Sequence, residues 1–326
     1  MRFPNFARQR WHPSSYASTA YHYARHFVRQ LLCKSFHASK AYHYLHLRAS
    51  NAKDGDALLV YQMGKVGSTT VMRLLRELGL EMSVHHVHVL TRESIERFES
   101  FVRESFDKSR KLTACNRPRL VKHLIFLKNL RKQLDRTDIN RKWKVITLVR
   151  DPVARNLSSF FQILDLQLNF GLQERLKSRG IDEVLTELFE LFFDEYPDHE
   201  VPLVFFDSEL KSVFGVDVFA TPFPKSKGFK IYKGENVKVL LMRLENLDEC
   251  APSAFHEFLE IEGFKVERSN VGSEKEYAEV YRRFLKDIRL PGSYLEKMYG
   301  SKVARHFYSQ EEIQAFESKW RRVALP

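Results

Sequence analysis

The segment Leu58-Leu-Val-Tyr-Gln-Met-Gly-Lys-Val-Gly-Ser-Thr-Thr70 decides the fold class of this chain. An apolar run leads into a Gly-x-x-Gly turn, and apolar side chains then recur at helical spacing. This order predicts a strand over 57–62, a glycine loop, and a helix over 68–79. Strands that alternate with helices in this way build a parallel sheet, with ligands at the carboxyl ends of the strands.

The loop has the composition of an anion-binding site. Its two glycines can adopt backbone angles that bring main-chain N–H groups close to an anion. Three hydroxyl residues follow at the start of the helix, where the helix dipole favours negative charge. A lysine adds a mobile positive charge. We expect phosphate binding here, and a capped turn with an exposed lysine is the alternative. The candidate binding residues are Gly64, Lys65, Val66, Gly67, Ser68, Thr69 and Thr70.

The position of the lysine distinguishes this loop from that of nucleotide hydrolases. Their motif, G-x-x-x-x-G-K-[ST], places lysine directly after the last glycine and uses the hydroxyl to hold magnesium. Here Lys65 precedes Gly67. The loop therefore fits a phosphate cradle without the usual magnesium site, and we expect no metal.

A second segment, Val145-Ile-Thr-Leu-Val-Arg-Asp-Pro-Val-Ala-Arg-Asn-Leu-Ser158, repeats the strand-to-helix pattern. Its β-branched, apolar start predicts a buried parallel strand over 145–149. Proline suits the first turn of the helix that we expect over 152–164. Arg150 at the strand end and Ser158 two turns into the helix can converge on one anion.

Together the two segments resemble the sulfotransferase superfamily, whose donor is 3'-phosphoadenosine 5'-phosphosulfate. Residues 62–70 are similar to its 5'-phosphosulfate loop, and Arg150 with Ser158 is similar to its 3'-phosphate site. Leu240-Leu-Met-Arg-Leu-Glu-Asn-Leu247 is similar to a late strand that ends in Glu-x-Leu.

The wider pattern includes Phe205-Phe-Asp-Ser-Glu-Leu and His306-Phe-Tyr-Ser. It resembles bacterial capsular polysaccharide synthesis and sulfotransferase-like proteins over about residues 57–322. The resemblance implies an α/β, P-loop-like three-layer fold with a central parallel sheet flanked by helices. A mostly helical C-terminal part follows.

Composition limits the class of protein further. The chain has 326 residues, 44% of them hydrophobic, which is ample for a core. Its three cysteines are widely spaced, which argues against a disulfide framework and a zinc site. No apolar run approaches 18 residues, and polar residues occupy the place of a signal peptide's apolar region. We therefore expect a cytoplasmic protein.

Residues 1–53 form a distinct N-terminal extension, before a catalytic domain at 54–326. The extension carries nine Lys or Arg residues and neither Asp nor Glu, so it supplies most of the net charge of +12. Its interleaved histidines and tyrosines favour a basic, aromatic helix on an anionic membrane surface. A poorly ordered arm or a targeting peptide would have a similar composition.

The remaining elements follow from periodicity. We expect a β-branched strand at 84–90 and largely helical structure at 91–138. Residues 201–232 are punctuated by Pro and Gly, which predicts an irregular segment with room for a short hairpin. Further elements are predicted as helices at 170–196, a strand at 237–243, and helices at 252–260, 275–287 and 311–321.

Residues 108–144 hold thirteen Lys or Arg residues against two Asp. This run is either a solvated helical face or a surface that attracts an anionic glycan acceptor. No recognised nucleic-acid module accompanies it, so no nucleic-acid partner is expected.

Sulfuryl transfer needs a cation beside the leaving phosphate and a base for the acceptor hydroxyl. We assign the first role to Lys65. His86 and His88 alternate on one strand, so they share a face and are the leading candidates for the base. His123 is the alternative, because cytosolic sulfotransferases place their catalytic histidine upstream of the second motif. Lys275, in Asn270-Val-Gly-Ser-Glu-Lys275, is a candidate for the 3'-phosphate, and a helix-capping loop is the alternative for this segment. Arg155 is either a further binding residue or a surface residue.

The sequence thus predicts an O-sulfotransferase that acts on a carbohydrate or polysaccharide hydroxyl and has a peripheral membrane contact through residues 1–53. A nucleotide-binding protein of capsular polysaccharide assembly without transfer activity is one alternative. A kinase-like phosphoryl transferase is the other.

Overall fold

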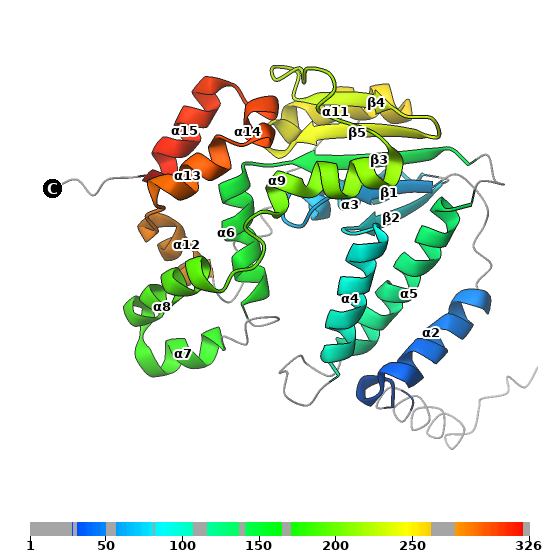
Figure 1. Ribbon diagram of the computed structural model, residues 1–326, viewed down its shortest axis with the longest axis horizontal. Coiled ribbons are helices and arrows are strands. Elements are labelled where there is room, and N and C mark those ends of the chain that lie inside the picture. Colours follow the sequence, from blue (N-terminus) through cyan, green and yellow to red (C-terminus); the bar gives the residue numbers. More distant parts are fainter. Residues whose placement is uncertain are drawn as a thin grey trace, which may run out of the picture. The chain divides into compact units, whose positions relative to one another are not determined.

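The computed structural model describes residues 28, 31–49, 57–80, 82–106, 116–136, 141–164, 171–261 and 278–321 (Figure 1). Two compact units divide the chain. The first comprises Met1–Asn51 with Glu99–Phe126, and the second comprises Ala52–Phe98 with Leu127–Pro326. The functional division predicted at residue 53 stays a prediction.

The second unit is built on a five-stranded sheet of order β2-β1-β3-β5-β4. Four strands are parallel, as predicted, and β4 pairs antiparallel with β5 at one edge. Every residue of β1 is buried, because helices cover both faces of a parallel sheet. The strands are β1 (Ala57–Tyr61), β2 (Ser83–Val87), β3 (Trp143–Val149), β4 (Phe229–Lys233) and β5 (Val237–Arg243).

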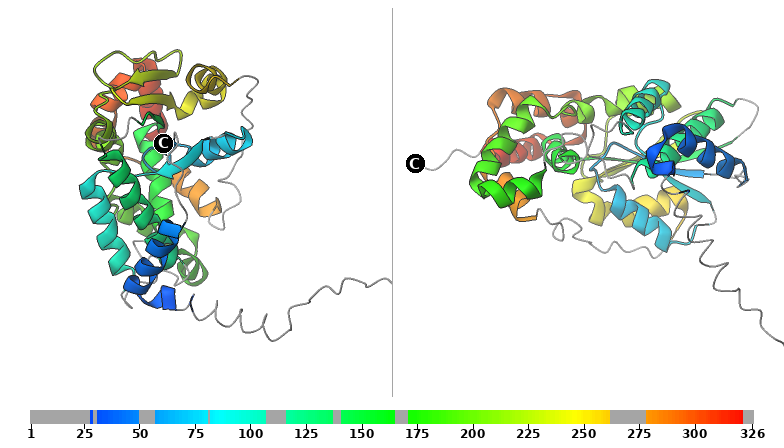
Figure 2. Two further views of the ribbon diagram at one scale, coloured as in Figure 1. Left: turned by 90° about the vertical axis from the view of Figure 1, so that its right-hand side faces the viewer. Right: turned by 90° about the horizontal axis from the view of Figure 1, so that it is seen from below.

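Helices form a layer on each face of this sheet. α3 and α11 pack against one face, and α9, η1 and α10 pack against the other (Figure 2). The described helices are α2 (Phe36–Ala49), α3 (Ser68–Glu77), α4 (Arg92–Glu104), α5 (Arg117–Leu134), α6 (Pro152–Ile163), α7 (Leu172–Arg179), α8 (Ile181–Asp194), α9 (Val201–Phe205), η1 (Phe206–Lys211), α10 (Ser212–Phe214), η2 (Leu244–Asn246), α11 (Leu247–Leu259), α12 (Ala278–Asp287), α13 (Gly292–Tyr299), α14 (Lys302–Phe307) and α15 (Gln310–Arg321).

The prediction of an irregular segment over 201–232 was wrong for its first half. Residues 201–214 are helical throughout, and Pro202 occupies the first turn, where its missing N–H costs no hydrogen bond. The rings of Phe205 and Phe214 both contact the ring of Tyr61. Burial against β1 therefore decides the conformation of a segment whose local sequence is ambiguous. The short hairpin expected within 201–232 is not formed there; β4 pairs instead with β5, which lies beyond that segment.

A buried carboxylate joins this helical segment to the sheet. Glu209 on η1 accepts hydrogen bonds from the hydroxyl of Tyr61, the N–H groups of Leu90 and Thr91, and the Thr91 hydroxyl. It is only 5% exposed. One side chain therefore satisfies donors from β1 and from the turn that starts α4.

The first unit contains α2 with the C-terminal part of α4 and the N-terminal part of α5. The Phe36 ring on α2 is buried and lies 5.9 Å from the Phe106 ring. Arg117 donates to the carbonyl oxygen of Cys33 at 3.4 Å. Most of the predicted extension, 1–27, 29–30 and 50–53, lies outside the described residues. In the part of the chain that is described, no helix is both long and apolar enough to cross a membrane.

We predict that Glu209→Ala lowers the free energy of unfolding by about 2–4 kcal/mol, because several buried donors lose their acceptor. Urea denaturation measures this loss. The matched control is Glu190→Ala on the exposed side of α8, which should change stability by less than about 0.5 kcal/mol. Equal stability of the two variants would show that Glu209 does not hold η1 to the sheet.

Candidate functional site

The loop that follows β1 has the backbone of an anion cradle. Lys65 and Gly67 both have left-handed φ angles, 71° and 94°. Gly67 is the N-cap of α3, and the first turn of that helix contains no acidic residue. Successive N–H groups in such a turn form a concave nest, and a helix leaves its first N–H groups without intrahelical partners. The predicted binding loop thus has donors to offer to an anion.

The two glycines have different roles. A Cβ atom added to Gly67 would lie 2.5 Å from Leu244 Cδ1, so any side chain there would collide with η2. At Gly64, a Cβ atom would meet no described atom within 4 Å. Gly67 therefore allows the loop to pack against the end of β5, and Gly64 leaves open space on the loop surface.

Two arginines hold the loop through its carbonyl oxygens. Arg150 Nη1 donates to the carbonyl oxygen of Lys65 at 2.9 Å, and Arg155 Nε donates to that of Gly64 at 3.1 Å. The surface alternative for Arg155 was wrong, since it is only 3% exposed. Ser158 lies one helical turn beyond Arg155 on α6 and is half-buried. The structure thus brings the two predicted motifs together at the carboxyl ends of β1 and β3.

A polar network continues from Arg155 away from the loop. Its Nη1 donates to Asn156 Oδ1, the Tyr196 hydroxyl and the Asp198 carbonyl oxygen at 3.0–3.1 Å. Asn156 in turn donates to the His199 carbonyl oxygen at 2.9 Å and the Tyr294 hydroxyl at 3.1 Å. The loop is therefore linked to the turn between α8 and α9.

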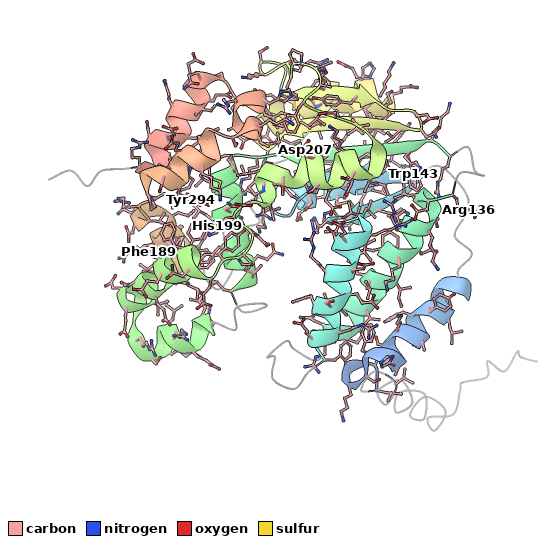
Figure 3. The ribbon with its side chains drawn as sticks, viewed as in Figure 1. Arg136, Trp143, Phe189, His199, Asp207 and Tyr294 are labelled. Atoms are coloured by element: carbon pink, nitrogen blue, oxygen red, sulfur yellow. The ribbon has the colours of Figure 1, made fainter. Side chains whose placement is uncertain are left out.

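The His199 ring determines which group donates the hydrogen bond between His199 and Tyr294. One ring nitrogen, Nε2, lies 2.8 Å from the Phe192 carbonyl oxygen and must donate to it. Burial lowers the pKa of His199, so Nδ1 accepts from the Tyr294 hydroxyl, 3.0 Å away (Figure 3). Nothing in the sequence motifs indicated these residues, because their partners are distant along the chain.

Two carboxylates fix the strand ends that carry the site: Asp151 is buried, and Glu245 is an exposed residue whose carboxyl group is desolvated. Asp151 caps α6 by accepting from the Val153 N–H, and it also accepts from the Tyr299 hydroxyl at 2.9 Å and Trp320 Nε1 at 3.3 Å. The N–H of Asp151 donates to Glu245 at 2.7 Å. Burial raises the pKa of both carboxyls. Helices α13 and α15 are thereby tied to the residue that follows Arg150.

The two candidate histidines lie side by side, although only His86 belongs to β2 and His88 directly follows it. The ring centroids of His86 and His88 are 4.5 Å apart. His88 Nδ1 lies 2.7 Å from the carbonyl oxygen of Gln62 and donates its hydrogen to it. Burial and, to a smaller extent, the nearby Arg155 charge lower the pKa of His88. The neutral ring with Nε2 as its basic nitrogen is therefore the favoured form.

Gln62 is a site residue that the motif analysis did not single out. Its side chain is completely buried directly before the loop, and neither amide atom has a hydrogen-bond partner among the described residues. A buried, unsatisfied amide costs free energy until a ligand or water bonds to it. Its position beside the anion cradle fits a ligand-binding role.

Two further candidates from the sequence are His123 and Lys275. His123 lies on α5 in the first compact unit, with its ring stacked on that of Phe126. Lys275 lies outside the described residues. Within the described ranges, no group of three His, Cys, Asp or Glu side chains is arranged to hold a metal ion.

A comparison with protein families matches residues 181–309 to the family described as "Putative capsular polysaccharide synthesis protein". The matched region contains Tyr196, His199 and Tyr294 of the network behind the loop, and it ends at Ser309 of the His306-Phe-Tyr-Ser segment. No curated protein and no solved structure matches the chain. The similarity therefore covers less than half of the chain, and it concerns residues 181–309 alone.

We predict that Arg155→Lys loosens the glycine loop, because an ammonium group cannot reproduce the set of hydrogen bonds made by the buried guanidinium. Hydrogen–deuterium exchange of the amides of residues 64–70 should become about tenfold faster or more. The control Arg179→Lys, on exposed α7, should leave this exchange unchanged. Unchanged protection in Arg155→Lys would contradict the role of Arg155 in holding the loop.

Proposed function

We propose that this chain is a sulfotransferase that moves a sulfuryl group from 3'-phosphoadenosine 5'-phosphosulfate to a hydroxyl of a polysaccharide. The main support is the hydrogen bond from Arg150 to the carbonyl oxygen of Lys65. It joins the loop that resembles a 5'-phosphosulfate site to the residue that resembles a 3'-phosphate ligand. The capsular polysaccharide family match supports the class of acceptor.

The residues present fit such a donor. The nest at residues 64–67 and the N-terminus of α3 suit the 5'-phosphosulfate, and the buried amide of Gln62 offers an additional partner. Arg150 and Ser158 suit the 3'-phosphate. Arg155 makes its hydrogen bonds to neutral oxygens, which leaves its positive charge to act on a bound anion. The donor supplies the activated sulfuryl group.

In the proposed reaction the acceptor hydroxyl oxygen forms a bond to sulfur, and the bond from sulfur to the phosphate oxygen breaks. The products are a sulfate ester and adenosine 3',5'-bisphosphate. Lys65 places a cation beside the leaving phosphate, where negative charge develops. Because its φ angle is left-handed and Arg150 holds its carbonyl oxygen, the loop sets the direction of the Lys65 Cα–Cβ bond.

The acceptor proton needs a base, and we assign this role to His88. Its Nδ1–H is used by the Gln62 carbonyl oxygen, which orients the ring and leaves Nε2 to take the proton. His86, whose ring packs edge-on against that of His88, positions it. His88 is preferred over His86 because the bond to Gln62 links it directly to the residue that starts the loop.

The first functional prediction concerns nucleotide choice. Adenosine 3',5'-bisphosphate should bind more tightly than AMP or ATP, and Arg150→Ala should remove most of this preference. Charge-assisted bonds to a phosphate contribute ~1.5–3 kcal/mol, which corresponds to a roughly 10- to 150-fold change in the affinity ratio. Calorimetry of the native protein, Arg150→Ala and the control Arg179→Ala measures this affinity ratio. Equal affinity of the native protein for AMP and the bisphosphate would refute the donor assignment, and magnesium-dependent ATP binding would favour a kinase-like transferase.

The second functional prediction concerns the base that takes the acceptor proton. His88→Ala should reduce transfer by ~10²–10⁴-fold while bisphosphate affinity is kept. In the native protein the pKa of His88 lies below its ordinary value of 6.5, so the neutral base persists as the pH falls through that value. The acid limb of the kcat/KM profile should therefore lie below pH 6.5. If His88→Ala retains native turnover and His123→Ala abolishes it, the assignment of the base is wrong.

A further inference from the structure

Three lysines converge on one histidine outside the proposed donor site. Lys225 Nζ donates to the Arg305 carbonyl oxygen at 2.9 Å, directly before His306. The Nζ of Lys302 lies 3.8 Å from the Phe219 ring centroid, and the His306 ring lies 5.1 Å from the same ring.

Lys230 completes the cluster from β4. Its Nζ donates to the Thr221 hydroxyl and the Pro222 carbonyl oxygen, both at 2.6 Å. We call Lys225, Lys230, Lys302 and His306 the cationic patch.

The charge of the patch is only partly neutralised. Residues 218–234 contain four lysines and neither Asp nor Glu. Lys302 Nζ lies 3.4 Å from Oδ2 of Asp207. Asp207 belongs to η1 (Figure 3). The hydrogen bonds of Lys225 and Lys230 go to neutral oxygens instead. Glu311 and Glu312 on α15 are near enough to Lys225 for its charge to lower the pKa of both carboxyls. Such a surface attracts anions and raises their local concentration.

An unsatisfied atom lies within the patch. The Nε2 of His306 is buried, and the described residues offer it no hydrogen-bond partner. The His306 ring also forms a hydrogen bond with the backbone of Val218. Burial and the charges of Lys230, Lys225 and Lys302 together lower the pKa of His306. A bound anion would oppose the effect of the lysine charges on the pKa of His306. It would also accept a hydrogen bond from Nε2 once that nitrogen is protonated.

The patch lies along the same edge of the sheet as the glycine loop. Because β4 is antiparallel, its first residue, Phe229, pairs with Met242 near the carboxyl end of β5. Arg243 then donates to the Lys225 carbonyl oxygen at 3.2 Å, and the next residue, Leu244, borders Gly67. β1 and β4 are three strand spacings apart, which is roughly 14 Å.

We propose that the cationic patch binds anionic groups, carboxylate, sulfate or phosphate, of a polysaccharide acceptor whose chain extends along this edge to the glycine loop. The direction in which the polysaccharide extends rests on the proposed function. The negative charge of the acceptor is the new inference. All four patch residues lie inside the region matched to capsular polysaccharide synthesis. That match favours a polysaccharide over nucleic acid or lipid as the polyanion.

The test uses dextran sulfate as the anionic probe and neutral dextran of the same length as its control. The triple variant Lys225→Gln/Lys230→Gln/Lys302→Gln should bind dextran sulfate at least tenfold more weakly than the native protein, with a smaller dependence on salt. The matched variant Lys177→Gln/Arg282→Gln/Lys286→Gln removes the same charge from exposed positions on α7 and α12 and should bind within about twofold of native. Neutral dextran should not bind.

The outcomes separate this proposal from the proposed function. Equal weakening in both triple variants, or in neither, overturns the patch. So does preferential competition by double-stranded DNA or by anionic vesicles, which would assign the surface to another class of partner. A native protein that binds dextran sulfate through the patch but not adenosine 3',5'-bisphosphate supports the patch and refutes the sulfotransferase proposal. As a second measurement, the NMR pKa of His306 should rise when dextran sulfate is added, and an unchanged pKa counts against direct contact.

Discussion

The arrangement of the site depends on one buried cation, the guanidinium of Arg155. Burying a charge is costly unless hydrogen bonds compensate it. Here the compensation comes from the Gly64 carbonyl oxygen on one side and from Tyr196 and the Asp198 carbonyl oxygen on the other. The glycine loop and the turn after α8 are therefore coupled: neither can move without removing an acceptor from the guanidinium. This coupling places the loop, which precedes the family-matched region, in one physical unit with it.

The residue after Arg150, Asp151, belongs to a second, acidic set of contacts. Asp151 caps α6 and is fixed by Tyr299 and Trp320, so helices near the C-terminus determine where the chain turns after β3. Glu245 is fixed by the Tyr308 hydroxyl and the Asp151 N–H in the same way. Asp151 is buried, and the donors from Val153, Tyr299 and Trp320 offset its burial. Its neighbour Arg150 reaches the loop instead, through the Lys65 carbonyl oxygen.

The sequence was most informative where local pattern and tertiary burial agree. Continuous apolar runs predicted β1, β3 and β5, and the glycine and proline signals predicted where α3 and α6 begin. β4, α13 and α14 were not predicted, and residues 201–214 were predicted to be irregular. Those short segments take their conformation from partners such as Tyr61, far away in the sequence. The burial of Arg155 could not be predicted for the same reason, since Gly64 and Asp198 are 91 and 43 residues away.

The distribution of cations along the carboxyl edge has an electrostatic consequence for two anionic substrates. Two unit charges about 14 Å apart repel by roughly 0.3 kcal/mol in water and about 1.2 kcal/mol near a protein surface with an effective dielectric constant of 20. Arg150 and Lys65 at one end and the cationic patch at the other are enough to offset repulsion of this size. Each cation group is held by its own hydrogen bonds, to loop carbonyl oxygens in one case and to residues 221, 222 and 305 in the other. On the proposed function, an anionic acceptor would bind before or after the donor, because each cation group has its own hydrogen-bond partners.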